Sequence, residues 1–268
     1  MSSTQRRPGS VLAVSLLGVA ALGTAFFFKP LPGLEEPGLL LSDAAVRVET
    51  GAVGLGFVPA GSPGAVKATG LVFYGGARVP PEAYAYLARA CARAGYTAVI
   101  LALPLRFAVL APSRASRAAL AYPGVARWVV AGHSLGGSAA AAFVAGGAKR
   151  DAKRGAKGGG AAMAVAGLLM LASYPGRGVD LSTKSLPVVT VGASRDVLAG
   201  SAKIAAAGVR LPAGSRYVEI AGGNHAQFGE YGSQPGDGVA DISGPTQREA
   251  VIEEALGLLD RAEAGVGK

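Results

Sequence analysis

Uninterrupted hydrophobic runs alternate along this chain with stretches that have the period of a helix. A run without polar alternation predicts a strand that is covered on both faces of its sheet. Such strands are expected at residues 71–74, 96–103, 128–131, 168–171, 186–191 and 217–220. Two further runs, at residues 46–50 and 53–58, predict an opening pair of strands for which antiparallel pairing is one arrangement.

Helical patterns stand between these runs and after the last of them. Residues 81–94 carry apolar side chains on one face and are followed by Gly95, a residue typical of helix ends. Residues 134–145 are mostly small, and residues 246–264 show one apolar stripe. Strands that alternate with helices indicate an α/β fold. We therefore expect a mainly parallel central sheet with helices on both of its faces.

The first part of the chain differs from the rest. Residues 8–28 form a run of 21 uncharged, mostly apolar residues, preceded by Arg6 and Arg7. As a helix this run would extend about 31 Å, which matches the hydrocarbon core of a bilayer. We expect residues 1–29 to be a retained single-pass membrane anchor, and the positive-inside rule then places the remainder on the non-cytoplasmic side. The alternative is a signal peptide that is cleaved after Ala25 and releases a secreted protein.

Two other segments fall outside the alternating pattern. Residues 30–42 contain three prolines and predict a stalk, which leaves residues 43–268 as one folded domain. Residues 149–160 hold five basic residues, one acid and four glycines, a composition that is unsuited to a core. We expect this segment to be an exposed basic loop.

The net charge of +9 raises the question of a nucleic-acid partner. Most of this charge has another origin. Arg6, Arg7 and Lys29 flank the apolar run and the 149–160 loop contributes a net four, which leaves +2 for the rest of the chain. The loop also lacks the interleaved aromatic side chains that stack on bases. We therefore expect no nucleic-acid partner, and a basic loop that could contact anionic headgroups.

Cysteine and histidine are scarce, which limits the chemistry. A single cysteine, Cys91, excludes an intramolecular disulfide and a cysteine-rich metal site. The two histidines, His133 and His225, are too few for a histidine-rich metal site. We expect no metal and no cofactor, so any reaction must be carried by side chains and backbone groups.

One short motif suggests such a reaction. Gly132-His133-Ser134-Leu135-Gly136 has the pattern GxSxG, but glycine fills 41 of 268 positions, so the match alone is a weak signal. Its context is more specific, because Ser134 stands between an expected strand and an expected helix of small residues. A nucleophile elbow requires that arrangement, with glycines that permit the tight turn. We predict Ser134 as a nucleophile; the alternative is an ordinary glycine-rich turn.

A serine nucleophile requires a base, and an acid that orients the base. His133 is the neighbour of Ser134 and its side chain should point away from that of the serine, so we expect His133 to be a packing residue and His225 to be the base. The acid should lie between the serine and the histidine in the chain. Asp196, directly after an expected strand, is the first choice, and Asp180 is the runner-up.

Two backbone N–H groups should stabilise the oxyanion of the reaction. One is expected from Leu135, the residue after the nucleophile. The other should follow the strand at residues 71–74, where Gly75, Gly76 and Ala77 stand. Gly76 is the first choice because glycine allows the backbone to approach closely, and Ala77 is the alternative.

These segments together resemble the alpha/beta-hydrolase superfamily, and within it the alpha/beta hydrolase fold-5 domain group. The resemblance covers roughly residues 70–242 and is most specific in Gly222-Gly-Asn-His-Ala-Gln-Phe-Gly229 and Tyr231-Gly-Ser-Gln-Pro-Gly-Asp-Gly238. It implies a serine hydrolase, and members often carry an N-terminal apolar anchor. One departure is Arg106-Phe107, which stands where an uncharged pair is expected and bears on the polarity of the pocket. The implied triad is Ser134, Asp196 and His225.

Access to the pocket follows from the spacing of two expected strands. Only about a dozen residues, 174–185, separate the strand at 168–171 from the strand at 186–191, so no large lid fits between them. The glycine-rich loop 226–244 is the better candidate for a cover. We predict a membrane-anchored carboxylic-ester hydrolase whose partner is a small or medium acyl ester. The alternative is a catalytically inactive binding or scaffold protein with the same fold.

Overall fold

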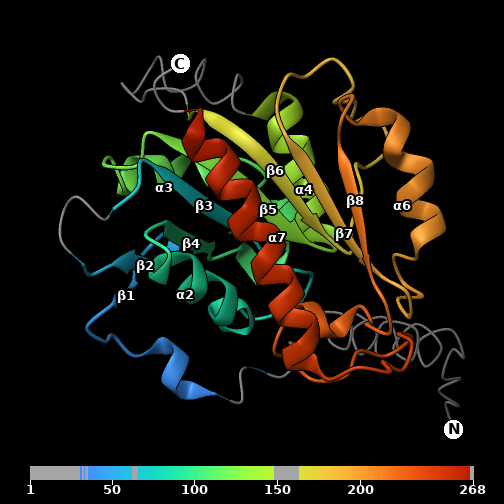
Figure 1. Ribbon diagram of the computed structural model, residues 1–268, viewed down its shortest axis with the longest axis horizontal. Coiled ribbons are helices and arrows are strands. Elements are labelled where there is room, and N and C mark those ends of the chain that lie inside the picture. The colour runs from blue at the N-terminus through green and yellow to red at the C-terminus, as the bar shows by residue number, and fades with distance from the viewer. Residues whose placement is uncertain (1–30, 32, 34–35, 62–65, 148–162, 266–268) are drawn as a thin grey trace, which may run out of the picture. The chain divides into compact units, whose positions relative to one another are not determined.

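The computed structural model describes residues 31, 33, 36–61, 66–147 and 163–265, which Figure 1 draws in colour. The chain divides into two units, Met1–Pro30 and Leu31–Lys268, and all described residues belong to the second. The predicted anchor at residues 8–28 and the predicted basic loop at residues 149–160 lie outside the described residues. No helix that the described residues form is both long enough and apolar enough to cross a bilayer.

An eight-stranded sheet forms the centre of this unit, with the strand order β1-β2-β4-β3-β5-β6-β7-β8. The strands are β1 (Val46–Thr50), β2 (Gly54–Pro59), β3 (Thr69–Tyr74), β4 (Thr97–Leu101), β5 (Arg127–His133), β6 (Val165–Leu171), β7 (Val188–Ala193) and β8 (Arg216–Ile220). β2 pairs antiparallel with both β1 and β4, and every other neighbouring pair is parallel. The predicted mainly parallel sheet is confirmed, and the opening pair of strands is antiparallel.

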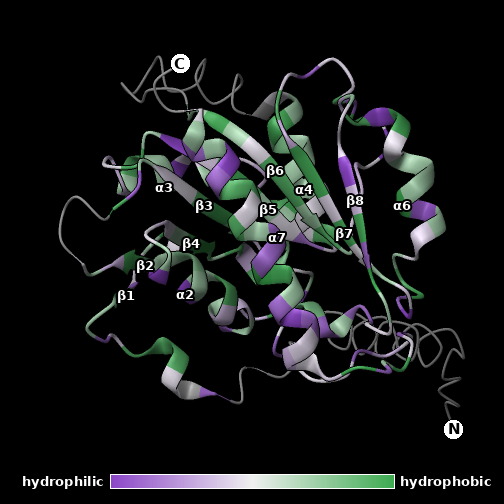
Figure 2. Cartoon of the chain, viewed as in Figure 1, coloured by the Kyte–Doolittle hydropathy of each residue, from purple (hydrophilic) through white to green (hydrophobic). Residues whose placement is uncertain are grey.

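Helices cover both faces of this sheet (Figure 1). They are α2 (Ala85–Arg93), α3 (Ala115–Ala121), α4 (Leu135–Ala142), α6 (Ser201–Ala207) and α7 (Gly244–Ala264). In β3, Leu71 shares a buried core with Leu258 of α7, whereas the next residue, Val72, shares a second core with Ala140 of α4. Successive side chains of a strand point to opposite faces, so the central strands must be apolar throughout. Figure 2 shows these strands as mainly hydrophobic.

The helices differ in detail from the predicted ones. The helix expected over residues 81–94 begins as a 3-10 turn, Pro81–Tyr84, and continues as α2. The helix expected over residues 134–145 begins only after Ser134 and passes into a π turn at Phe143–Gly147. The hydrophobic pattern does not reveal α3 and α6, because each has seven residues and is too short to show an apolar period.

The loops at the carboxyl ends of the strands lie along one edge of the sheet. The connection from β6 to β7, residues 172–187, contains no helix or strand and leaves no room for a lid domain. The connection from β8 to α7 is longer and contains a short 3-10 helix, Ala226–Phe228. In open sheets of this kind, ligands bind at this edge.

Candidate active site

Ser134 occupies a sharp turn between β5 and α4. Its backbone has φ +53° and ψ −124°, a conformation that costs a non-glycine residue about 1–3 kcal/mol. The Ser134 N–H donates a hydrogen bond of 2.9 Å to the Leu171 carbonyl at the end of β6. A Cβ atom on Gly132 would lie 2.5 Å from the Gly136 carbonyl carbon, and one on Gly136 would lie 2.2 Å from the Tyr74 carbonyl oxygen. Both glycines are therefore needed for the tight turn, as in a nucleophile elbow.

A second serine supports this turn from the end of β6. The buried Ser173 hydroxyl donates to the Ser134 carbonyl oxygen over 2.6 Å. The Ser138 hydroxyl lies 3.3 Å from that of Ser173 and donates to the Tyr174 carbonyl over 2.8 Å. Ala172, which precedes Ser173, has φ +45°, so the chain is strained on both sides of this contact. The sequence pattern gives no sign of this role, because the two serines of the 2.6 Å contact stand 39 positions apart.

His225 and Asp196 form a buried pair in the loops that follow β8 and β7. His225 Nδ1 lies 2.8 Å from Asp196 Oδ2, and the two side chains are 2% and 0% exposed. The other oxygen of the carboxylate accepts hydrogen bonds of 2.8 Å from the N–H groups of Leu198 and Ala199. The carboxylate is thus held in place and can orient the imidazole.

The second candidate acid from the sequence does not compete for this position. Asp180, the runner-up from the sequence, is exposed and accepts a hydrogen bond of 2.8 Å from the Ser182 N–H, which holds the pKa of Asp180 below its ordinary value. The Asp180 carboxylate therefore forms a hydrogen bond within its own loop, and Asp196 is the acid that contacts His225. Across the described ranges, no group of three or more His, Cys, Asp and Glu residues could hold a metal ion.

The base predicted from the sequence lies beside the elbow. The ring centroid of His225 is 4.7 Å from that of His133, the residue that precedes Ser134. His133 is fully buried, and the rings of Phe228 and Tyr231 lie 5.7 and 6.3 Å from it. The structure therefore brings the loop that carries His225 next to the end of β5, directly before Ser134 and α4.

His133 has a polar partner in addition to its packing contacts. Its Nδ1 atom lies 2.9 Å from the hydroxyl oxygen of Tyr84. Burial lowers the pKa of His133 well below its ordinary value, and the charge of His225 lowers it further. The His133 ring is therefore neutral near pH 7. The sequence predicts only a packing role for His133, and the structure adds this hydrogen bond.

The candidate oxyanion donors differ in availability. Leu135 is the first residue of α4, so its N–H has no acceptor within the helix. The Gly76 N–H donates a buried hydrogen bond of 2.9 Å to the Tyr84 hydroxyl. Within the part of the chain that the structure describes, the Ala77 N–H donates no hydrogen bond. This arrangement favours Ala77 over Gly76, the first choice from the sequence, because the Gly76 donor is already used.

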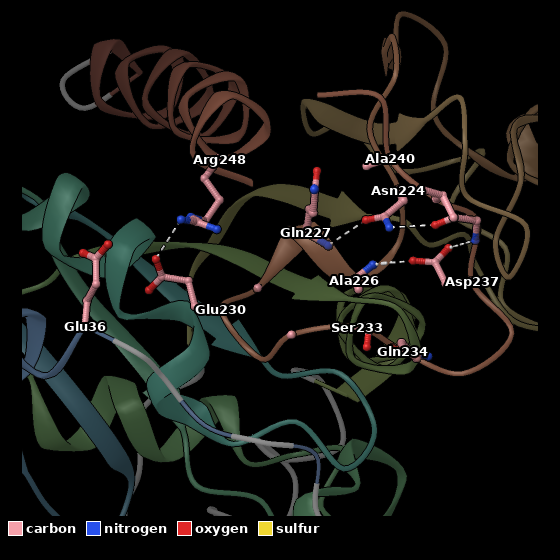
Figure 3. Close-up of a pocket in the computed structure, with 14 residues that line it drawn as sticks. Glu36, Asn224, Ala226, Gln227, Glu230, Ser233, Gln234, Asp237, Ala240 and Arg248 are labelled. Carbon is pink, nitrogen blue, oxygen red and sulfur yellow. Dashed lines mark hydrogen bonds and ion pairs between the residues drawn. The ribbon is translucent and has the colours of Figure 1, made fainter. Parts of the chain in front are cut away.

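A polar cavity of about 550 Å³ lies in the loop between β8 and α7 (Figure 3). Asn224 and Ala226, the two neighbours of His225 in the chain, line it together with an ion pair of 3.0 Å between Arg248 and Glu230. His225 itself does not line the cavity, since its side chain points away toward Asp196. The cavity is therefore adjacent to the base loop but separate from the reactive groups.

A smaller cavity of about 160 Å³ lies beside the turn that follows β3. Its lining is mostly aliphatic and consists of Gly75, Val79, Pro81, Leu101, Ala102, Leu103 and Arg106. Gly75 also touches the start of α4, since a Cβ atom on Gly136 would lie 2.4 Å from the Gly75 carbonyl oxygen. The cavity thus adjoins the segment that carries the candidate oxyanion donors. Arg106, the residue that departs from the family pattern, is part of its wall.

Comparison with known protein families identifies the family of the chain. A family model described as the alpha/beta hydrolase family matches residues 70–249, which are 180 of the 268 residues. The matched range contains the Ser134 elbow and the Asp196–His225 pair. Among curated proteins, none matches the chain.

Proposed function

The chain belongs to the alpha/beta hydrolase family, and from this premise we propose that it is a serine hydrolase that cleaves carboxylic esters. The observation that carries the proposal is the buried contact of 2.8 Å between His225 and Asp196. Support for a base near the strained turn of Ser134 comes from the His225 ring, whose centroid is 4.7 Å from that of His133. Acyl transfer by a serine requires this combination of nucleophile, base and orienting acid.

The proposed reaction has two halves. Ser134 Oγ attacks the ester carbonyl carbon while His225 Nε2 takes the hydroxyl proton, and the tetrahedral intermediate then expels the alcohol, which leaves with that proton. A water molecule next gives a proton to His225 and attacks the acyl-enzyme. The second intermediate collapses, the carboxylic acid leaves, and Ser134 Oγ regains its proton. The Asp196 carboxylate stabilises the imidazolium that forms in each half.

The backbone N–H groups of Leu135 and Ala77 are the proposed oxyanion donors. Leu135 stands at the amino end of α4, where the helix dipole also favours negative charge. Support for Ala77 comes from its N–H, which donates no hydrogen bond to any described residue, and from the bond that joins the Gly76 N–H to Tyr84.

The acyl group is proposed to enter the aliphatic cavity beside Gly75. A volume of about 160 Å³ holds about five groups of the size of a water molecule or a methylene, at about 30 Å³ each. This size supports small or medium acyl chains as substrates. The short β6–β7 connection, residues 172–187, adds no lid that would extend the pocket.

The membrane attachment is proposed from the sequence of residues 8–28, with the hydrolase domain on the non-cytoplasmic side and cleavage after Ala25 as the alternative. Extraction of membranes with alkaline carbonate tests this proposal. The full-length protein should stay in the pellet, and a variant that lacks residues 1–29 should be released. Release of the uncleaved full-length protein would contradict an anchor.

The hydrolase proposal is tested by labelling the purified full-length protein with a fluorophosphonate, which reacts with activated serines. We expect one labelled peptide that contains Ser134, no label in Ser134→Ala, and slower labelling in His225→Ala. The exposed Ser182 provides a control, because Ser182→Ala should label at the wild-type rate. A folded wild-type protein that takes no label would overturn the proposal and favour an inactive binding or scaffold protein.

A further inference from the structure

We propose that His133 is a positioning residue that couples the oxyanion loop to the base His225. The oxyanion loop is residues 75–79, between β3 and the Pro81–Tyr84 turn. The proposal rests on the proposed serine hydrolase function, because it concerns two parts of that site. The GxSxG pattern leaves the position of His133 open to any residue, so this role is additional to the motif.

Two hydrogen bonds connect the oxyanion loop to His133. The Gly76 N–H donates to the Tyr84 hydroxyl oxygen over 2.9 Å, and the same oxygen lies 2.9 Å from His133 Nδ1. Burial raises the pKa of Tyr84 above its ordinary value, so the phenol keeps its proton. We infer that the Tyr84 hydroxyl donates this proton to His133 Nδ1, which accepts the hydrogen bond. If Nδ1 were the donor instead, the buried hydroxyl proton would have no partner.

This direction determines the tautomer of His133. When Nδ1 accepts, the ring proton resides on Nε2, which is buried and has no hydrogen-bond partner within the described part of the chain. Burial and the charge of His225 lower the pKa of His133, and the backbone carbonyl of His225 acts in the opposite direction. His133 thus bonds to Tyr84 through Nδ1, and its ring packs against that of the base, with 4.7 Å between the two centroids.

Packing holds the His133 ring in this orientation. A Cβ atom on Gly76 would lie 2.9 Å from His133 Nδ1, so a residue larger than glycine would push the loop away from the ring. Four further rings surround it at centroid distances of 4.7 to 6.3 Å, those of Tyr84, His225, Phe228 and Tyr231. A ring enclosed in this way transmits its position to both loops.

Other contacts join the same regions but reach neither reactive group. The Tyr86 hydroxyl donates to the Phe228 carbonyl over 3.0 Å, and the Glu230 N–H donates to the Ala83 carbonyl over 2.8 Å. These bonds set the overall spacing between the β3–α2 connection and the base loop. The His133 ring, by contrast, packs against the imidazole of His225, with 4.7 Å between the two centroids.

The consequence lies in the rate of the chemical step. In the proposed reaction His225 transfers a proton while negative charge develops near Leu135 and Ala77, so the relative position of these groups matters most in the transition state. A neutral His133 is also required, because a cation 4.7 Å from His225 would disfavour the imidazolium. Loss of His133 should therefore lower kcat and leave KM nearly unchanged.

The test compares three variants of the full-length protein on p-nitrophenyl butyrate. His133→Phe keeps an aromatic ring and removes both nitrogens, Tyr84→Phe removes the hydroxyl, and His133→Asn retains an amide oxygen near the position of Nδ1. We expect kcat to fall about tenfold in His133→Phe and Tyr84→Phe, with KM within about twofold of wild type. His133→Asn should recover part of the loss.

The double variant Tyr84→Phe/His133→Phe should be no slower than the slower single variant, because both changes remove the same hydrogen bond. Val251→Ala, on the buried face of α7, is the matched stability control and should lower the unfolding temperature without changing kcat. An unchanged kcat in folded His133→Phe, or additive losses in the double variant, would overturn the proposal. If His133→Phe does not fold, kcat and KM of Tyr84→Phe decide by the same criteria.

Fluorophosphonate labelling separates this outcome from failure of the hydrolase proposal. A wild-type protein that labels at Ser134, together with a His133→Phe variant of wild-type kcat, refutes the coupling alone. A folded wild type that never labels refutes the hydrolase function, and the coupling with it.

Discussion

Asp196 Oδ2 lies 2.8 Å from His225 Nδ1, and solvent reaches almost none of either side chain. Because the other carboxylate oxygen accepts two backbone N–H groups, the carboxylate cannot turn away from the ring. A carboxylate fixed in this way holds the proton of the neutral ring on Nδ1, and Nε2 is left free to accept a proton from a serine. The contact therefore supplies both the orientation and the tautomer that the proposed reaction needs.

The first prediction concerns this contact. Asp196→Asn should lower kcat/KM about 10³- to 10⁴-fold, because the amide cannot stabilise the imidazolium and favours the wrong tautomer. Asp180→Asn is the matched control, since Asp180 is exposed and should leave kcat/KM unchanged. Hydrolysis of p-nitrophenyl butyrate measures both. A large loss in Asp180→Asn with normal activity in Asp196→Asn would show that the acid has been assigned to the wrong residue.

The second prediction concerns the support of the elbow. Ser173→Ala removes the hydrogen bond of 2.6 Å to the Ser134 carbonyl and should lower the free energy of unfolding by about 1 kcal/mol. It should also reduce kcat, because the strained turn of Ser134 loses a fixed contact. Urea unfolding and ester hydrolysis measure the two effects. A variant with full stability and full kcat would show that the elbow does not depend on Ser173.

The third prediction concerns the space at Gly76. A methyl group there would lie 2.9 Å from His133 Nδ1 and 3.1 Å from the Tyr84 hydroxyl, so Gly76→Ala should destabilise the protein by about 1–3 kcal/mol. Gly124→Ala is the control, because a Cβ atom there has no neighbour within 4 Å. Thermal unfolding should separate the two variants clearly. Equal unfolding temperatures would mean that the oxyanion loop shifts at little cost.

The fourth prediction concerns pH and the junction of α7 with β3. Glu263 accepts hydrogen bonds from the N–H groups of Ala68 and Thr69 over 3.1 and 2.9 Å. Burial raises the pKa of Glu263, but these bonds and the charge of Lys67 outweigh it, so the pKa lies below its ordinary value. The stabilisation is complete above the unfolded-state pKa of about 4.3 and is lost as the pH falls through the lower folded-state value.

Glu263→Gln should therefore reduce the free energy of unfolding at pH 7 and flatten its decrease in acid. Urea unfolding at several pH values below and above about 4.3 measures this dependence. Glu253→Gln, on the exposed side of the same helix, should keep the wild-type profile. A Glu263→Gln profile that parallels wild type in acid would contradict the contribution of these hydrogen bonds.

The fold follows largely from the chain's hydrophobic runs. Strands such as β3 and β5 carry unbroken apolar runs, at residues 71–74 and 128–131, because helices cover both faces, and a sequence can reveal that condition directly. The site residues also leave a local signature. His225 is the only histidine apart from the neighbour of Ser134, and Asp196 stands three residues after the end of β7.

The features of the site that the sequence does not predict depend on contacts between distant parts of the chain. The bond from Gly76 to Tyr84 decides which N–H stays free, and the hydroxyl of Ser173 holds the Ser134 carbonyl. Neither leaves a local pattern, because serine and tyrosine are common in many other settings. The pattern around His133 predicts only a packed ring, since its hydrogen bond becomes visible once β5 lies beside the β3–α2 connection.

The order of the strands also has a consequence for biosynthesis. Ser134 follows β5, whereas His225 follows β8, the last strand and an edge of the sheet. A ribosome releases the serine long before the histidine, so a nascent chain carries an elbow without its base. Contacts between such distant segments form late in folding. If the proposed reaction holds, reactivity toward esters therefore arises only when the sheet is complete, and folding intermediates should show none.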